Sequence, residues 1–125
     1  MSELKKKILV VEDEKPMAHA LELKLKSSGF DADVAHDGEA ALEHILTNSY
    51  DLVLLDLVIP KKDGFGVLAE LKEKGNTTPI FVTSNLSQQE DEKKARELGA
   101  QGYLIKSNTP LLKIIETIKE FLHVV

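Results

Sequence analysis

The chain has 125 residues, of which 42% are hydrophobic and 30% are charged, and its formal net charge is -5 at pH 7. This balance predicts a single domain over residues 1–125 with its own apolar core, and the acidic surplus disfavours nucleic acid as a partner. The absence of cysteine excludes disulfides, thiolate metal sites and cysteine nucleophiles. The apolar run at residues 8–11 is too short for a signal peptide or a membrane span, so we expect a cytoplasmic protein with no membrane partner.

Apolar runs predict five strands. Four runs, rich in Val, Ile and Leu, are nearly continuous, as central parallel strands buried on both faces should be: residues 8–11, 52–55, 80–82 and 103–105. Residues 31–35 instead alternate between polar and apolar side chains, which is typical of a strand near the edge of a sheet.

Helical patterns separate these strands. Their start signals are Pro16, Asp37, Asp63 with Gly64, Ser87 with Glu90 as a capping box, and Thr109 with Pro110. The side chains expected to face the core are Met17, Leu21 and Leu25; Leu42, Ile45 and Leu46; Leu68 and Leu71; Ala95 and Leu98; and Leu111, Ile115, Ile118 and Leu122. Ile114 and Phe121 widen the apolar arc of the last helix, which indicates either a partner surface or a broad core face.

Strict alternation of strands and helices with short connections predicts a doubly wound α/β fold. In this class an open parallel sheet carries helices on both of its faces. Ligands bind beyond the carboxyl ends of the strands, where the strand order reverses.

Charged residues follow the apolar runs. Glu12 and Asp13 come after the first run, Asp56 after DLVLL and Lys106 after GYLI, and Thr83 ends the run PIFV. If the strands are parallel, these side chains converge at one edge of the sheet. Clustered carboxylates need a cation, and Mg2+ prefers oxygen ligands. Charges that merely terminate strands would explain any one of these residues, but they explain the whole set poorly.

A magnesium site here would suit phosphoryl transfer. Mg2+ held by Asp13 and Asp56, and by Glu12 through water, is complete only with phosphate oxygens. Asp56 is then the candidate nucleophile, because an ionised carboxylate can attack phosphorus. Lys106 would pair with Asp56 before transfer and with a phosphoryl oxygen afterwards, while Thr83 would donate a hydrogen bond to another oxygen. Taken singly, such a lysine is usually solvated and such a threonine simply favours a strand.

Four segments resemble the receiver domains of the two-component response-regulator family: VVEDE, LLDLVIPKKDG, FVTSN and GYLIKS. The resemblance covers nearly the whole chain, and the motifs are specific as a set. It implies the flavodoxin-like fold of the chemotaxis regulator, with strand order 2-1-3-4-5. It also implies Mg2+ as cofactor, Asp56 as phosphoacceptor, Glu12 and Asp13 as metal-site acids, and the main-chain carbonyl of Val58 as a further metal ligand.

The resemblance also assigns switching and rate-tuning residues. Thr83 and Lys106 match the switch hydroxyl and lysine, and Tyr103 matches the aromatic residue that rotates inward on activation. A half-buried strand tyrosine that never switches is the alternative for Tyr103. Val58 and Asn85 match the positions that tune attack of water on the acyl phosphate.

Partners follow from the same resemblance. The donor is a sensor histidine kinase or a phosphotransfer protein that carries a phosphohistidine. The surface formed by helix 4, strand 5 and helix 5 binds a downstream effector, with a second copy of the chain as an alternative. The resemblance also implies that the domain is not an enzyme beyond self-catalysed phosphotransfer and slow autodephosphorylation.

Departures from the family pattern affect the surroundings of the predicted site. Ser107 stands where the family usually has a proline, often after a cis peptide, so the geometry of the Lys106 loop is left open. Ser84 replaces the common Ala or Gly and is expected to narrow the phosphorylation pocket. The histidines, His19, His36, His44 and His123, are expected away from the acidic edge, as structural or surface residues.

Other functions fit less well. A phosphohydrolase with an aspartate nucleophile needs an acid two residues after it, and Val58 occupies that position. A flavodoxin-like cofactor carrier needs a phosphate loop where the acidic residues 12–14 stand. A receiver-like binding module that is never phosphorylated is disfavoured because all the required residues are present. The chain could equally be a full-length regulator or a piece of a hybrid kinase or longer regulator.

Overall fold

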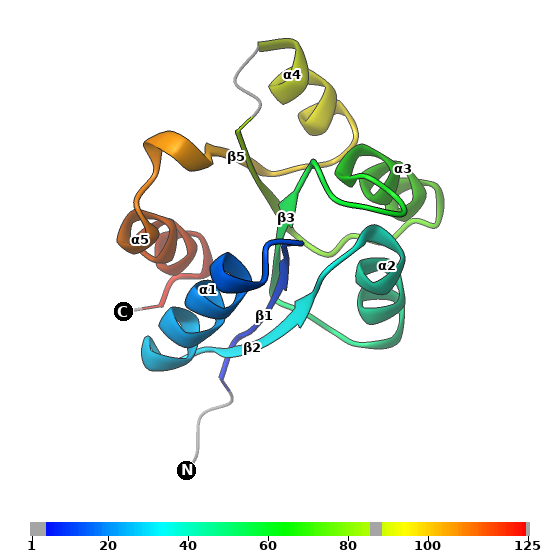
Figure 1. The fold of residues 1–125 in the computed structure, drawn as a ribbon. Helices are drawn as coiled ribbons and strands as arrows, with labels where there is room; N and C mark the ends of the chain where they lie inside the picture. The colour runs from blue at the N-terminus through cyan, green and yellow to red at the C-terminus, as the bar shows by residue number, and fades with distance from the viewer. Residues whose placement is uncertain (1–4, 86–88, 125) are drawn as a thin grey trace.

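The computed structural model describes residues 5–85 and 89–124, which form a five-stranded sheet covered by helices on both faces (Figure 1). The strands are β1 (Lys7–Val11), β2 (Asp31–Ala35), β3 (Leu52–Asp56), β4 (Ile80–Ser84) and β5 (Gly102–Ile105). The helices are α1 (Lys15–Ser27), α2 (Gly38–Thr47), α3 (Gly64–Glu73), α4 (Gln89–Glu97) and α5 (Leu111–Leu122), with a 3-10 turn, η1 (Lys106–Asn108), before α5.

The strand order is β2-β1-β3-β4-β5, and every neighbouring pair is parallel. The predicted doubly wound α/β fold and its strand order are therefore confirmed. All strands present their carboxyl ends at one edge, and the order reverses at β1, where the chain moves from β2 across β1 to β3. Of the helices described here, none is long and apolar enough to span a bilayer.

Two apolar layers sandwich the sheet. On one face α1 and α5 pack over alternate strand residues such as Ile8, Leu54 and Phe81. On the other face α2, α3 and α4 pack over residues such as Leu9 and Val53 (Figure 1). Because successive side chains of a strand point to opposite faces, a strand buried on both sides needs an apolar residue at every position, which explains the continuous runs in β1, β3 and β4.

Two helix faces differ from prediction. Met17 and Leu46 are 40% and 45% exposed, so neither side chain faces the core. Ala18 in α1 and Ala41 in α2 hold the buried positions instead. A repeat of 3.6 residues places these small alanines closer to the centre of each stripe than the larger side chains that the apolar pattern favoured. The capping-box residue Ser87 lies outside the described residues, and α4 begins at Gln89.

The wide apolar arc of α5 belongs to the core. Ile114 is buried, and the Phe121 ring makes an edge contact with Phe81 at a centroid distance of 4.8 Å. Of the two explanations for these residues, the structure supports the broad core face. Leu112, on the other side of α5, is 57% exposed.

The strand β5 is an edge strand, as the strand order implied by the family resemblance requires, whereas its apolar run alone predicted a central strand. Its four residues are all half-buried. The cover over this edge is thin because α4 contributes only Ala95 as a buried residue. The other edge strand is β2, as its alternating sequence predicted.

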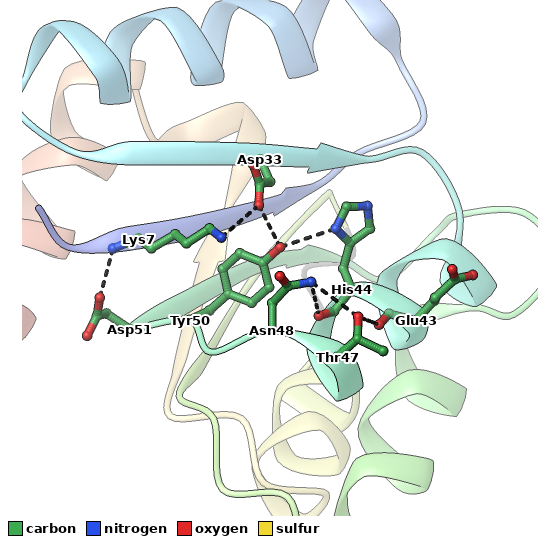
Figure 2. A network of polar contacts seen from close by, with 8 residues as sticks. All are labelled: Lys7, Asp33, Glu43, His44, Thr47, Asn48, Tyr50 and Asp51. Atoms are coloured by element: carbon green, nitrogen blue, oxygen red, sulfur yellow. Dashed lines mark hydrogen bonds and ion pairs between the residues drawn. The ribbon is translucent and has the colours of Figure 1, made fainter.

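A polar network lies near the β2 edge of the sheet and includes Lys7, the first residue of β1 (Figure 2). The Lys7 backbone N–H donates to the Asp51 carboxylate at 2.7 Å. The Tyr50 hydroxyl donates to Asp33 Oδ2 at 2.7 Å, and the Lys7 ammonium lies 3.5 Å from that oxygen. The His44 ring nitrogen is 3.2 Å from the Tyr50 hydroxyl, so this histidine has a structural role. The network joins β1, β2 and α2 through side chains.

Candidate metal centre

The carboxyl edge of the sheet gathers the charged residues that end the strands. Asp56, the last residue of β3, is in register with Thr83 of β4. Because Val11 is in register with Leu55, the next residue, Glu12, stands level with Asp56. Lys106 follows β5 directly and begins η1. Parallel pairing therefore brings together residues that are far apart in the sequence.

Three carboxylates meet at this edge. Glu12, Asp13 and Asp56 each place one oxygen within 4.8 Å of the others. Glu12 and Asp56 are buried, with exposed fractions of 1% and 6%, whereas Asp13 is exposed. The Lys106 ammonium lies between the two buried acids, 2.5 Å from Glu12 Oε1 and 3.0 Å from Asp56 Oδ2. Lys106 therefore pairs with two of the three acidic groups.

Burial and pairing shift the ionisation of these groups. Burial raises the pKa of the Glu12 carboxyl, although the hydrogen bond from Lys106 acts against the shift. Burial also tends to lower the pKa of Lys106, but hydrogen bonds to Glu12 and Asp56 outweigh it and the pKa lies above its ordinary value. Lys106 is therefore firmly charged at neutral pH.

The donor set fits Mg2+. All the side-chain ligands are carboxylate oxygens, which this hard cation prefers. Both oxygens of Glu12 already accept hydrogen bonds, one from Lys106 and the other from the Glu14 backbone N–H at 3.1 Å. Glu12 is also buried and, unlike Asp13 and Asp56, does not line the cleft that opens over this edge, so it is better placed to bind a metal-bound water than the ion itself. Asp13 and Asp56 are left as the side chains for direct contact.

A cleft of about 320 Å³ opens over these groups. Its lining residues are Asp13, Glu14, Asp56, Val58, Asn85 and Lys106. The Val58 backbone N–H donates to Asp56 Oδ1 at 3.1 Å, and the Val58 side chain is 63% exposed at the rim. Ser84, which was expected to narrow this space, is fully buried and is not one of the lining residues.

Thr83 and Tyr103 lie outside the cleft. Thr83 is buried beside Asp56 but lines a neighbouring apolar cavity of about 220 Å³ with Met17 and Ile114. Lys106 lines both spaces and forms the wall between them. Tyr103 of β5 is half-buried against the core layer of α2, α3 and α4, and burial raises the pKa of its hydroxyl.

The loop after β5 is a regular turn. Residues Lys106–Asn108 form η1, and no cis peptide bond occurs in the described part of the chain, the Lys106–Ser107 bond included. The turn presents the Lys106 side chain inward while Ser107 is exposed. A serine therefore fits this loop in the trans form.

Sequence analysis missed one residue at this edge. His36 follows β2, and its ring Nδ1 lies 3.0 Å from the Glu12 carbonyl oxygen. It was expected away from the acidic edge, so that prediction is wrong for His36. Its position directly after the second strand was the available signal, because every strand end of a parallel sheet reaches the same edge.

The comparison with known families is decisive. Residues 8–119 match the response regulator receiver domain. The chain belongs to this family. The resemblance predicted from the four sequence motifs is confirmed.

Relatives of the receiver domain are longer proteins. Transcriptional regulatory protein DltR of Streptococcus agalactiae is 45% identical over 100 residues, which are 80% of this chain and 45% of DltR. Alkaline phosphatase synthesis transcriptional regulatory protein PhoP of Bacillus subtilis is 37% identical over 107 residues, which are 86% of this chain and 45% of PhoP. The chain therefore spans about half the length of these curated relatives.

Solved structures share the fold. The receiver domain of the Francisella response regulator 1452 superposes with a TM-score of 0.88 at 31% identity, covering 93% of this chain and 95% of that one. The response regulator TrrA of Thermotoga maritima, solved in complex with Mg2+ and BeF, gives a TM-score of 0.81 at 30% identity, covering 92% of this chain and 97% of that one.

Proposed function

We propose that the receiver domain accepts a phosphoryl group on Asp56 in a two-component phosphorelay, from a phosphohistidine of a sensor histidine kinase or phosphotransfer protein. The observation that carries this proposal is the buried Asp56 carboxylate in the cleft, 3.0 Å from the Lys106 ammonium and beside two further acids. Such a carboxylate is held in place by its partners and is accessible from the cleft, as a nucleophile in phosphoryl transfer should be.

Asp13, Asp56 and the Val58 main-chain carbonyl would hold Mg2+, with Glu12 acting through water. The fit rests on the carboxylate oxygens that meet within 4.8 Å and on the cleft lining, which includes Asp13 and Asp56 but not Glu12. Bound Mg2+ would neutralise negative charge on the phosphoryl oxygens. The protein's part is to hold Asp56 and the ligand oxygens in place.

In the transfer step, an Asp56 carboxylate oxygen attacks phosphorus while the phosphorus–nitrogen bond of the donor breaks. The imidazole nitrogen leaves with the bonding electron pair and takes up a proton from solvent, and an acyl phosphate remains on Asp56. Lys106 now pairs with Asp56 Oδ2, and it would pair with a phosphoryl oxygen afterwards. Thr83, in register with Asp56 on the next strand, would donate its hydroxyl to another phosphoryl oxygen.

The output surface would be α4, β5 and α5. The helix α4 is weakly anchored, since among Gln89–Glu97 only Ala95 is buried. Its described polar ties include a cation–π contact of Lys94 with Phe65 at 4.4 Å and a hydrogen bond from Lys72 to the Glu97 carbonyl. Few apolar contacts make displacement easy. Movement of Thr83 toward the phosphoryl group, with Tyr103 turning inward, would change this surface for an effector or a second copy.

The test is phosphorylation by a small donor. Incubation with acetyl phosphate and Mg2+, followed by intact-mass measurement, should add one phosphoryl group to the wild type. Asp56→Asn should remain unmodified because an amide is not a nucleophile toward phosphorus. Omission of Mg2+ should suppress the addition. Equal labelling of Asp56→Asn, or an unlabelled wild type in the presence of Mg2+, would contradict the proposal.

A further inference from the structure

One segment at the carboxyl edge of the sheet supplies no candidate metal ligand, but it contacts both of the loops that carry the candidate ligands. It is the β2–α2 loop, residues 36–37, taken together with Gly38, the first residue of α2. The β1–α1 loop, residues 12–14, carries Glu12 and Asp13. The β3–α3 loop, residues 57–63, begins directly after Asp56 and contains Val58. The three loops lie together because the strand order places β2, β1 and β3 side by side.

Gly38 is pressed against the backbone of the β3–α3 loop. Its N–H donates to the Pro60 carbonyl at 3.2 Å, and a Cβ built on Gly38 would lie 1.8 Å from the Lys62 carbonyl oxygen. The neighbouring Lys61 has a φ of 70°, which is unusual for a residue with a side chain, and its ammonium lies 3.7 Å from the Asp37 carboxylate. The contact is therefore between backbones, where no side chain can move aside.

His36 contacts the β1–α1 loop. Its ring Nδ1 lies 3.0 Å from the Glu12 carbonyl oxygen. A carbonyl oxygen only accepts hydrogen bonds, so Nδ1 carries the proton and donates. The Glu12 N–H in turn donates to the Ala35 carbonyl at 3.0 Å. Both backbone groups of Glu12 are thus fixed by the end of β2 and the loop that follows it.

We infer that Gly38 and His36 are positioning residues for the Mg2+ site: Gly38 sets the position of the β3–α3 loop and His36 that of the β1–α1 loop. The inference rests on the proposed function. It adds that the distance between the two groups of ligands is set by a third loop, which binds neither the metal nor the phosphoryl group. Groups of this kind typically change metal affinity by about 10- to 100-fold when they are removed.

A displacement at Lys62 would reach the ligands because the β3–α3 loop is closed at its base. The Gly64 N–H donates to the Leu57 carbonyl at 2.9 Å, which joins the two ends of the loop. A methyl group on Gly38 would push the Lys62 carbonyl outward, and the closed loop would carry Val58 with it. The helix α2 itself would not suffer, since alanine is a better helix former than glycine.

The experiment measures Mg2+ affinity by calorimetry on metal-free Gly38→Ala and wild-type protein. We expect Gly38→Ala to bind Mg2+ about tenfold or more weakly, with slower phosphorylation by acetyl phosphate at low Mg2+. The matched control is Gly66→Ala, because the three atoms nearest to its new Cβ all belong to side chains, with the flexible Lys62 side chain first, at 2.8 Å from Cγ. Gly66→Ala should bind Mg2+ like the wild type.

Variants of His36 keep the inference testable if Gly38→Ala does not fold, as judged by thermal melting. His36 is exposed, so its replacement leaves the core intact. His36→Ala should weaken Mg2+ binding, and His36→Asn should restore it, because the asparagine amide N–H can occupy the place of the Nδ1–H donor.

The outcomes separate the two proposals. Unchanged Mg2+ affinity in a folded Gly38→Ala protein overturns the inference but leaves the proposed function intact. If Gly38→Ala does not fold, unchanged affinity in His36→Ala overturns it. A wild type that does not bind Mg2+ overturns the proposed function first. Weakened binding in Gly38→Ala, with Gly66→Ala unaffected, supports both.

Discussion

Asp13 is the exposed member of three clustered carboxylates, and Lys106 pairs with the other two, Glu12 and Asp56. Without a metal these like charges repel, and the Asp13→Asn change removes part of that repulsion. We expect Asp13→Asn to stabilise the metal-free protein by an amount on the order of 1 kcal/mol. Conversely, Mg2+ should raise the melting temperature of the wild type, through binding to the folded state, and have little effect on the variant.

Thermal melting with and without Mg2+ checks this prediction. Asp31→Asn is the control, since Asp31 is also exposed but begins β2 at the opposite end of the sheet. It should leave the Mg2+-induced shift unchanged. An equal Mg2+ shift in Asp13→Asn and the wild type would count against metal binding at Asp13.

Val58 lines the cleft with a side chain that cannot orient water. The acyl phosphate on Asp56, if it forms as proposed, should therefore decay slowly. Val58→Asn supplies an amide that can hydrogen-bond an attacking water, and a hydrogen bond of about 1 kcal/mol corresponds to roughly fivefold faster decay. Loss of the phosphoprotein over time, followed by intact mass, gives the rate.

Val58→Ala serves as the control for that measurement, because it reduces side-chain size without adding a polar group. Its decay should stay close to that of the wild type. Decay in Val58→Asn that is unchanged or slower than in the wild type would show that this position does not limit access of water.

At the level of residues, the charged groups of the site could be predicted from the sequence, but the backbone contacts that position their loops could not. Glu12, Asp13, Asp56 and Lys106 could be predicted to meet because each follows an apolar run. The role of Gly38 could not, because it depends on the 1.8 Å approach of a backbone oxygen from another loop. Such distances arise only once the helices are packed.

Among the elements, β2 is tied to its neighbours by the Tyr50 network (Figure 2). Burial opposes ionisation of Asp33, but the Tyr50 hydroxyl and the Lys7 ammonium outweigh it and lower the pKa below its ordinary value of 3.8. A carboxyl group with a lowered pKa in the folded state stabilises the fold at pH values above its ordinary pKa, and this contribution is lost as the pH falls through the folded pKa.

Tyr50→Phe removes the hydroxyl but keeps the ring, which lies 5.2 Å from the Lys7 ammonium. We expect the free energy of unfolding to fall by about 1 kcal/mol or less at neutral pH, because Asp33 is partly solvated. The difference from the wild type should shrink at pH values below 3.8, where Asp33 becomes protonated. Urea unfolding at both pH values measures it.

Measuring the same Tyr50→Phe effect in an Asp33→Asn protein tests whether the Asp33 carboxyl causes its pH dependence. With no carboxyl group at position 33, the effect of Tyr50→Phe should no longer depend on pH in this range. A pH dependence that persists in the Asp33→Asn background would place its origin elsewhere in the network.

Element positions were predictable where the sequence pattern matched the local environment. β1 and β3 are buried on both faces and read as continuous apolar runs, whereas β5 has a similar run but lies at the edge. The run alone cannot reveal the thin cover that the polar helix α4 gives to β5. In α1, the apolar pattern predicted that Met17 faces the core, but the structure exposes Met17 and buries the smaller Ala18.

For the whole molecule, alternation of strands and helices was enough to predict an open parallel sheet. Alternation does not specify which strands are neighbours, and the order β2-β1-β3-β4-β5 came from the family resemblance. Once that order is given, the meeting of the strand ends follows from geometry alone. The contacts between the loops do not follow from the strand order, because they depend on how α2 and α3 pack against each other.

The positions of the two tyrosines have a practical consequence. The chain has no tryptophan and two tyrosines, so its intrinsic fluorescence comes from Tyr50 and Tyr103. Tyr50 is hydrogen-bonded within the anchored network, while Tyr103 belongs to the half-buried edge strand β5. In a Tyr50→Phe protein all remaining emission would originate on β5, which gives that strand a label-free optical probe of its surroundings.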